Sequence, residues 1–130
     1  DQKVKEKADV EETINFLGGI SYDKVDEYLS ESHFVIIPSK IDNLPTVGLE
    51  SLMNKTPLLI SNTTGLSEYL EDGKDCFKFT PNVESIDLLL HRVENNFIQQ
   101  SQMSKFARET FLNKFGLMSY CVDFSNQILQ

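Results

Sequence analysis

Cysteine, histidine and basic residues are scarce in this sequence, and each shortage argues against a class of protein. The two cysteines, Cys76 and Cys121, stand beside apolar residues and join no histidine in the close spacing of a zinc site. We therefore expect no bound metal and two buried free thiols in a reducing compartment. Lys and Arg number 12 against 20 Asp and Glu, so the formal charge is −8. A general nucleic-acid binder needs a basic surface, and this charge disfavours one.

Long apolar runs, a signal peptide and glycine-rich phosphate loops are missing as well. No apolar run approaches the roughly 20 residues of a membrane span. The first residues lack the charged and apolar regions of a signal peptide. Neither Gly-x-Gly-x-x-Gly nor a P-loop occurs. Because the sequence opens on Asp1 and not on Met, we expect it to be part of a longer protein.

Short apolar runs alternate with helical patterns along the chain. Hydrophobic residues make up 40% of the sequence, which is enough for a packed core. The predicted strands cover residues 13–17, 34–37, 57–60 and 76–79. The predicted helices cover 22–30, a segment from near Pro45 to 54–55, 66–71, a segment from 82 or 85 to 99, and two helices in 101–130 separated at Phe115-Gly116. This alternation predicts an α/β, Rossmann-like fold with a parallel sheet.

The strand at 34–37 is apolar without alternation, which predicts burial on both faces. Residues 1–12 are charged and indicate the end of a polar helix or a linker. Parallel α/β sheets bind ligands beyond the carboxyl ends of their strands. Those ends fall at residues 18–21, 38–44 and 61–65, where we expect the ligand.

Residues 38–50, PSKIDNLPTVGLE, form a strand-turn-helix unit at one of these ends. A helix that starts near Pro45 leaves the early N–H groups of Thr46, Val47 and Gly48 without intrahelical partners. Such groups can bind a phosphate oxygen. The alternative is an ordinary capped helix, in which Asp42 or Asn43 accepts hydrogen bonds from those N–H groups.

Two carboxylates bracket this unit, with seven residues between Asp42 and Glu50. Glu50 shares a helix face with Thr46 and Val47, and its carboxylate could accept hydrogen bonds from both hydroxyls of a ribose. Asp42 could accept hydrogen bonds from sugar hydroxyls or stabilise positive charge on a reacting sugar carbon. The alternatives are a surface glutamate for Glu50 and an Asx turn for Asp42.

The order of these motifs resembles the C-terminal domain of GT-B-fold retaining glycosyltransferases, of the family 4 or group 1 type. The resemblance covers residues 13–95. It is strongest in the pattern of an acidic residue, seven further residues and a glutamate, which here runs from Asp42 to Glu50. FLG at 16–18, TPLLIS at 56–61 and GLSEYLEDG at 65–73 follow the same order. The sequence departs from the family in having Asp42 for the commoner glutamate and Lys55 where a glycine usually follows the helix.

The resemblance implies a role for each matching residue. Glu50 would bind the ribose, and Asp42 would contact the donor sugar as the catalytic residue. Gly19 and Ile20 would lie against the base. The diphosphate and sugar would be held by the turn and the start of the helix, namely Asn43, Leu44, Pro45, Thr46 and Val47.

The implied activity is transfer of a hexose-type sugar from a UDP- or GDP-sugar to a glycan or lipid, with retention and without a metal or other cofactor. Polysaccharide or glycoconjugate biosynthesis is the implied process, in the cytoplasm or at the inner face of the membrane with peripheral association. Nucleic acid is not an expected partner. A GT-B-fold nucleotide-sugar epimerase and a non-catalytic α/β interaction module are the alternatives.

The resemblance also implies what the chain lacks. Residues 1–130 would be a partial C-terminal domain, without the N-terminal acceptor domain, the first strands of its own domain and the Arg and Lys residues that neutralise the diphosphate. We therefore expect the isolated chain to be inactive. The strand at 13–17 would lose its usual neighbours. It would then pair with 34–37, or it would pair with another chain and form a dimer through the exposed sheet edge.

Overall fold

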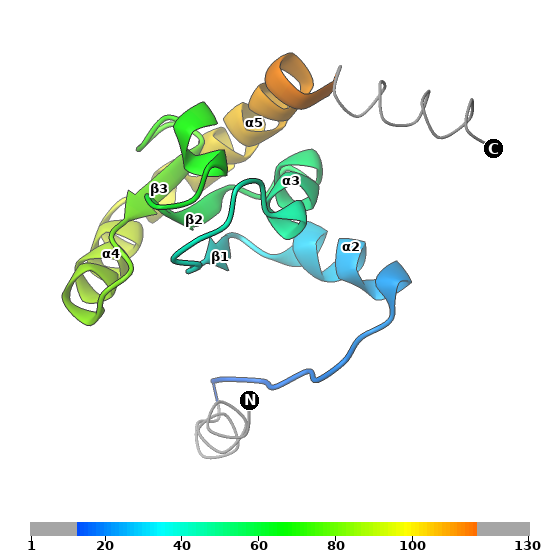
Figure 1. The fold of residues 1–130 in the computed structure, drawn as a ribbon, viewed down its shortest axis with the longest axis horizontal. Coiled ribbons are helices and arrows are strands. Elements are labelled where there is room, and N and C mark those ends of the chain that lie inside the picture. The colour runs from blue at the N-terminus through cyan, green and yellow to red at the C-terminus, as the bar shows by residue number, and fades with distance from the viewer. Residues whose placement is uncertain (1–12, 117–130) are drawn as a thin grey trace.

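A computed structural model describes residues 13–116 of the chain (Figure 1). Three parallel strands, β1 (Val35–Ile37), β2 (Leu58–Ser61) and β3 (Cys76–Phe79), form one sheet in the order β1-β2-β3. The predictions for residues 1–12, for the helix after 116 and for Cys121 lie outside the described residues. The α/β alternation and the parallel sheet are confirmed.

Helices connect the strands in the predicted places (Figure 1). The helix predicted at 22–30 is found, and the one predicted from near Pro45 ends at the predicted position. Asn82 caps the helix that follows β3, because its side chain accepts a hydrogen bond from the Ser85 N–H at 2.8 Å. The α-helices are α2 (Tyr22–Glu31), α3 (Thr46–Met53), α4 (Val83–Asn95) and α5 (Gln100–Thr110). Two short 3-10 helices, η1 (Leu66–Tyr69) and η2 (Phe97–Gln99), and a π-helix, η3 (Phe111–Phe115), complete the described elements.

The strand predicted at residues 13–17 is wrong. Thr13 lies in a turn and residues 14–17 have no regular secondary structure. None of them pairs with a strand of the described sheet, and Ile14 is 50% and Phe16 43% exposed. In Figure 1 the segment lies apart from the sheet and leads into α2. A β-prone run becomes a strand only when a neighbour takes its backbone hydrogen bonds. The predicted pairing with 34–37 is therefore also absent.

Burial of β1 on both faces is likewise wrong. Ile37 is buried, but Ile36 remains 45% exposed. β1 stands at the edge of the described sheet, and successive side chains of a strand point to opposite faces. Ile36 points to the same face of the sheet as Leu59 of β2 and Phe77 of β3. Leu89 of α4 packs against those two residues and leaves Ile36 uncovered.

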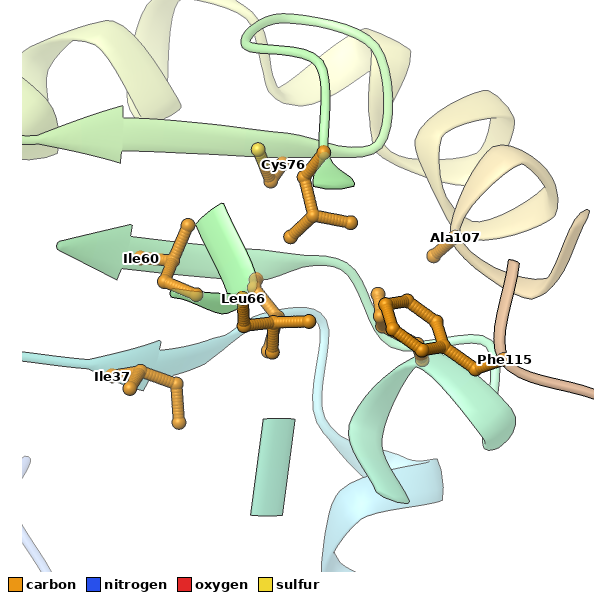
Figure 2. Packing of buried hydrophobic residues seen from close by; sticks show 9 residues of the cluster. Ile37, Ile60, Leu66, Cys76, Ala107 and Phe115 are labelled. Atoms are coloured by element: carbon orange, nitrogen blue, oxygen red, sulfur yellow. The ribbon is translucent and has the colours of Figure 1, made fainter. Parts of the chain in front are cut away.

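Two hydrophobic clusters sandwich the sheet. Leu58 and Ile60 point into one cluster and Leu59 into the other, as the alternation of a strand requires. The first cluster joins the strands to α3, α5 and η3 (Figure 2) and contains Ile37, Leu52, Leu58, Ile60, Leu66, Leu70, Cys76, Ala107 and Phe115. The second contains Leu59, Phe77, Phe79, Leu89 and Met103. Burial raises the pKa of the Cys76 thiol, with neighbouring Asp75 as a second cause, so this cysteine is the predicted neutral, buried thiol.

Buried hydroxyls fix α2 and α3 to the start of β2. The Thr56 hydroxyl donates to the Leu29 carbonyl at 2.6 Å, and the Ser51 hydroxyl donates to the Thr56 carbonyl at 2.8 Å. Between them Lys55 has φ of 63°, the left-handed conformation that usually favours glycine. The left-handed conformation of Lys55 agrees with the glycine that usually follows this helix in the family that the sequence resembles. Within residues 13–116, no helix is long and apolar enough to cross a membrane.

Candidate functional site

Two loops meet at the carboxyl ends of β1 and β2. The Gly65 N–H donates to the Asp42 carbonyl at 2.8 Å, and Asp42 forms a parallel bridge with Thr64. The Thr63 hydroxyl donates to the Ser39 carbonyl at 3.3 Å. The loop that carries Asp42 is therefore held by the loop after β2, at the edge where a parallel sheet binds ligands.

Gly65 allows this close approach. A Cβ atom at position 65 would lie 2.2 Å from the carbonyl oxygen of Asn43, a distance that no real side chain tolerates. The backbone angles of Gly65 are helical, φ −64° and ψ −35°, so the small size of glycine matters here and not its conformational freedom. The sequence predicted residues 61–65 as a ligand edge but did not single out Gly65.

The N-terminus of α3 is open. Pro45 is the N-cap residue, whereas the sequence predicted that it would be the first residue of the helix. No side chain caps this helix. Within the described part of the chain, the N–H groups of Thr46 and Val47 have no acceptor. The N–H of Gly48 donates to the Pro45 carbonyl at 3.0 Å, so the prediction that it is free is wrong. Capping by Asp42 or Asn43 is not adopted.

The side chains of the turn divide between solvent and core. Asp42 and Asn43 are exposed, and the Asp42 carboxylate accepts no hydrogen bond from residues 13–116. Leu44 packs against the first cluster and Pro45 is buried. Burial of these two residues fixes the turn, while the Asp42 carboxylate stays exposed to solvent.

Glu50 lies partly buried on α3, one turn beyond the open N–H groups. Loss of solvent raises the pKa of its carboxyl group, and the negative charge of Asp26 raises it further. Asp26 belongs to α2 and accepts a hydrogen bond from the Asn54 amide at 3.2 Å, while that amide also donates to the Glu50 carbonyl at 2.8 Å. Glu50 is therefore not an ordinary exposed glutamate. No local pattern marked Asp26, because only packing of α2 on α3 brings it close.

Gly19 and Ile20 are exposed on the segment that leads into α2. A Cβ atom at Gly19 would meet nothing within 4 Å. Within residues 13–116, no hydrogen bond joins either residue to Glu50 or to the turn before α3. The structure thus gathers Asp42, Thr46 and Glu50 on one strand-turn-helix unit and leaves the predicted base contact apart.

A parallel sheet with loops meeting at its carboxyl edge, followed by an open helix N-terminus, is the arrangement of an α/β, Rossmann-like fold. Residues 2–110 match the family described as "Glycosyl transferases group 1". The chain belongs to this family. No curated protein matches it.

Solved structures confirm the fold. Sucrose-phosphate synthase from Thermosynechococcus elongatus superposes with a TM-score of 0.80 at 16% identity, over 99% of this chain and 33% of that one. Anabaena HepE in complex with UDP-glucose gives a TM-score of 0.77 at 14% identity, over 98% of this chain and 36% of that one. The chain thus spans about a third of the length of these structures.

Proposed function

We propose that this chain binds the nucleotide-diphospho-sugar donor of a glycosyltransferase. The open N-terminus of α3 is the observation that carries this proposal. Unpaired backbone N–H groups at a helix N-terminus, with the positive end of its dipole, bind phosphate oxygens. Thr46 and Val47 provide two such groups among the described residues, and no side chain occupies them.

The carboxylates on either side of these N–H groups would complete the donor site. Glu50 would accept hydrogen bonds from the ribose hydroxyls, which can satisfy a partly buried carboxylate. Asp42 would contact the sugar from the exposed turn, next to backbone groups of residues 43–47. Gly19 and Ile20 would reach the base only if the segment before α2 folds back over α3. UDP and UDP-glucose, which are bound in solved structures of HepE, are the natural probes.

The finer features of the reaction belong to the same proposal. The donor is a UDP- or GDP-hexose, the acceptor is a glycan or lipid whose reacting group is bound outside this chain, and transfer retains configuration without a metal. Such a protein would work in glycan biosynthesis in the cytoplasm, at or near the inner face of the membrane. Support comes from the family and from the carboxylate at position 42, which can stabilise a positively charged sugar carbon.

Binding of UDP to the protein at its natural full length tests the ribose assignment. We expect Glu50→Ala to raise the Kd by about tenfold or more, because hydrogen bonds to a charged group contribute about 1.5–3 kcal/mol. Isothermal titration calorimetry gives the Kd directly. Glu27→Ala is the matched control, because Glu27 is exposed on α2, and it should leave the Kd unchanged. Equal Kd values for Glu50→Ala and the parent protein would refute the assignment.

A further inference from the structure

A second concave site lies between the end of β3 and α4. Its cavity has a volume of about 400 Å³. Asn62 and Thr80 come from the chain just after β2 and β3, and Ser85 comes from the first turn of α4. No residue of the stretch 38–50 lines it. The proposed donor site therefore does not account for this pocket.

The rim of the pocket carries neutral donors and acceptors. The side-chain amide N–H of Asn62 donates to the Thr80 hydroxyl at 3.1 Å, and the backbone carbonyl of Asn62 accepts from the Ser67 hydroxyl at 3.4 Å. The Oδ1 atom of Asn62 accepts no hydrogen bond from residues 13–116. Asn62 and Thr80 are exposed, and Ser85 is half-buried. An amide and two hydroxyls in one rim can exchange hydrogen bonds with a ligand that both donates and accepts.

A rigid ion pair closes another side. Nη1 of Arg92 lies 2.8 Å from Oδ1 and 3.0 Å from Oδ2 of Asp72, and the Lys78 N–H donates to Oδ1 at 2.9 Å. The Arg92 guanidinium also lies over the Phe77 ring, 4.6 Å from its centroid. Both charged groups are thus positioned before a ligand arrives, and they neutralise each other. Lys78 also lines the pocket and adds one positive charge. A small anion would meet the carboxylate of Asp72, and a small cation would meet Arg92 and Lys78.

The floor and one wall are apolar. Phe79 and Leu89 are 5% and 3% exposed and belong to the second hydrophobic cluster. Leu88 lines the wall but stays 69% exposed. An apolar side chain that solvent still reaches, beside a pocket of this size, can gain stability when a ligand covers it.

We propose that the pocket between β3 and α4 binds one hexopyranose unit of a glycan. A pyranose presents hydroxyls around its edge and apolar C–H groups on its faces. The rim of amide, hydroxyls and charged groups matches the hydroxyls, and the exposed Leu88, above the buried Phe79 and Leu89, matches a C–H face. That the glycan is the acceptor or product rests on the proposed function, whereas the sugar site itself rests on the pocket alone.

Saturation-transfer NMR on the full-length protein tests the site. The probes are the methyl α-pyranosides of glucose, galactose and mannose, each titrated with UDP present in excess. We expect saturable binding of at least one probe in the millimolar range. Ser85→Phe places a ring in the cavity and should weaken that binding at least tenfold. Asn62→Ala should weaken it several-fold.

Glu84→Phe is the matched control. It adds the same ring on the same helical turn, at an exposed residue outside the pocket, and should leave sugar binding unchanged. Circular dichroism verifies that all variants fold. No saturable binding by any probe, or equal binding in Ser85→Phe, would overturn the proposal. UDP affinity, measured on the same samples, should not change in Ser85→Phe. If the parent protein does not bind UDP, the donor site is refuted, whereas the result for the sugar site remains valid.

Discussion

At the scale of single residues, the carboxylates differ because their surroundings differ. Asp42 is exposed on a turn, whereas Glu50 is partly buried and faces the charge of Asp26 across the α2–α3 contact. Both burial and a like charge make an ionised carboxylate unfavourable. The ionised Glu50 carboxylate therefore destabilises the folded protein without ligand. The two ribose hydroxyls of a nucleotide-sugar would reduce this destabilisation by donating hydrogen bonds to the carboxylate.

The unfavourable environment of the ionised Glu50 carboxylate predicts how the stability of the protein changes with pH. Because the pKa of Glu50 is raised in the folded state, the native protein binds more protons than the unfolded chain just above the ordinary Glu pKa of about 4.3. The contribution of Glu50 to stability should therefore fall as the pH rises through the raised pKa. Glu50→Gln should become progressively more stable than the parent between acid and neutral pH, as measured by urea unfolding.

Two variants control this measurement. Asp26→Asn removes the second cause of the shift and should make the difference between parent and Glu50→Gln smaller. Glu27→Gln, at an exposed position on α2, should follow the parent profile. Parallel profiles for Glu50→Gln and the parent protein would contradict the burial of an ionised Glu50.

At the scale of elements, the site depends on how closely α3 and the loop after β2 approach each other. A Cβ atom at Gly48 would lie 2.6 Å from Cδ2 of Leu66, and one at Gly65 would lie 2.2 Å from the Asn43 oxygen. Leu66 can move because it is a side chain, but the Asn43 carbonyl belongs to the backbone. Gly65 is therefore the stricter requirement for the position of the turn that holds Asp42.

We expect Gly65→Ala to destabilise the protein by about 1–3 kcal/mol, because the methyl group forces the backbone of Asn43 away. The same shift should weaken UDP binding. Urea unfolding gives the stability, and calorimetry gives the affinity. For the stability measurement Gly19→Ala is the control, since a Cβ atom there meets open space. A Gly65→Ala protein as stable as the parent would show that the two loops are not held as closely as described.

At the scale of the whole molecule, the chain spans about a third of the solved structures that it matches. Its described sheet has three strands, and β1 at the edge leaves Ile36 exposed. In the donor site the phosphate would meet N–H groups of α3, with exposed Lys40 in the preceding loop. A few N–H groups do not replace bidentate cationic contacts to a diphosphate.

We therefore expect residues 1–130 alone to bind UDP weakly and to transfer no sugar. Release of UDP from UDP-glucose, with a glycan or lipid acceptor present, measures transfer. The full-length protein, assayed in parallel, should release UDP. Turnover by residues 1–130 above the enzyme-free rate would contradict this expectation.

Local patterns were sufficient for much of the fold and part of the site. Apolar runs bounded by Pro38 and Pro57 predicted β1 and β2 to within a residue or two, and the start of α3 followed from Pro45. These signals are local because proline restricts its own backbone and its neighbour. The pairing of residues 13–17 was wrong, because strand formation needs a partner that local pattern cannot supply.

The sequence by itself determined that residues 34–50 form a strand-turn-helix unit with one carboxylate in the turn and one in the helix, because its hydrophobic pattern and proline act locally. Only the tertiary structure decided that Gly65 touches Asn43, that Asp26 faces Glu50, and that a pocket opens beside α4. Each of these depends on contacts between residues far apart in the chain, which packing of the whole domain creates.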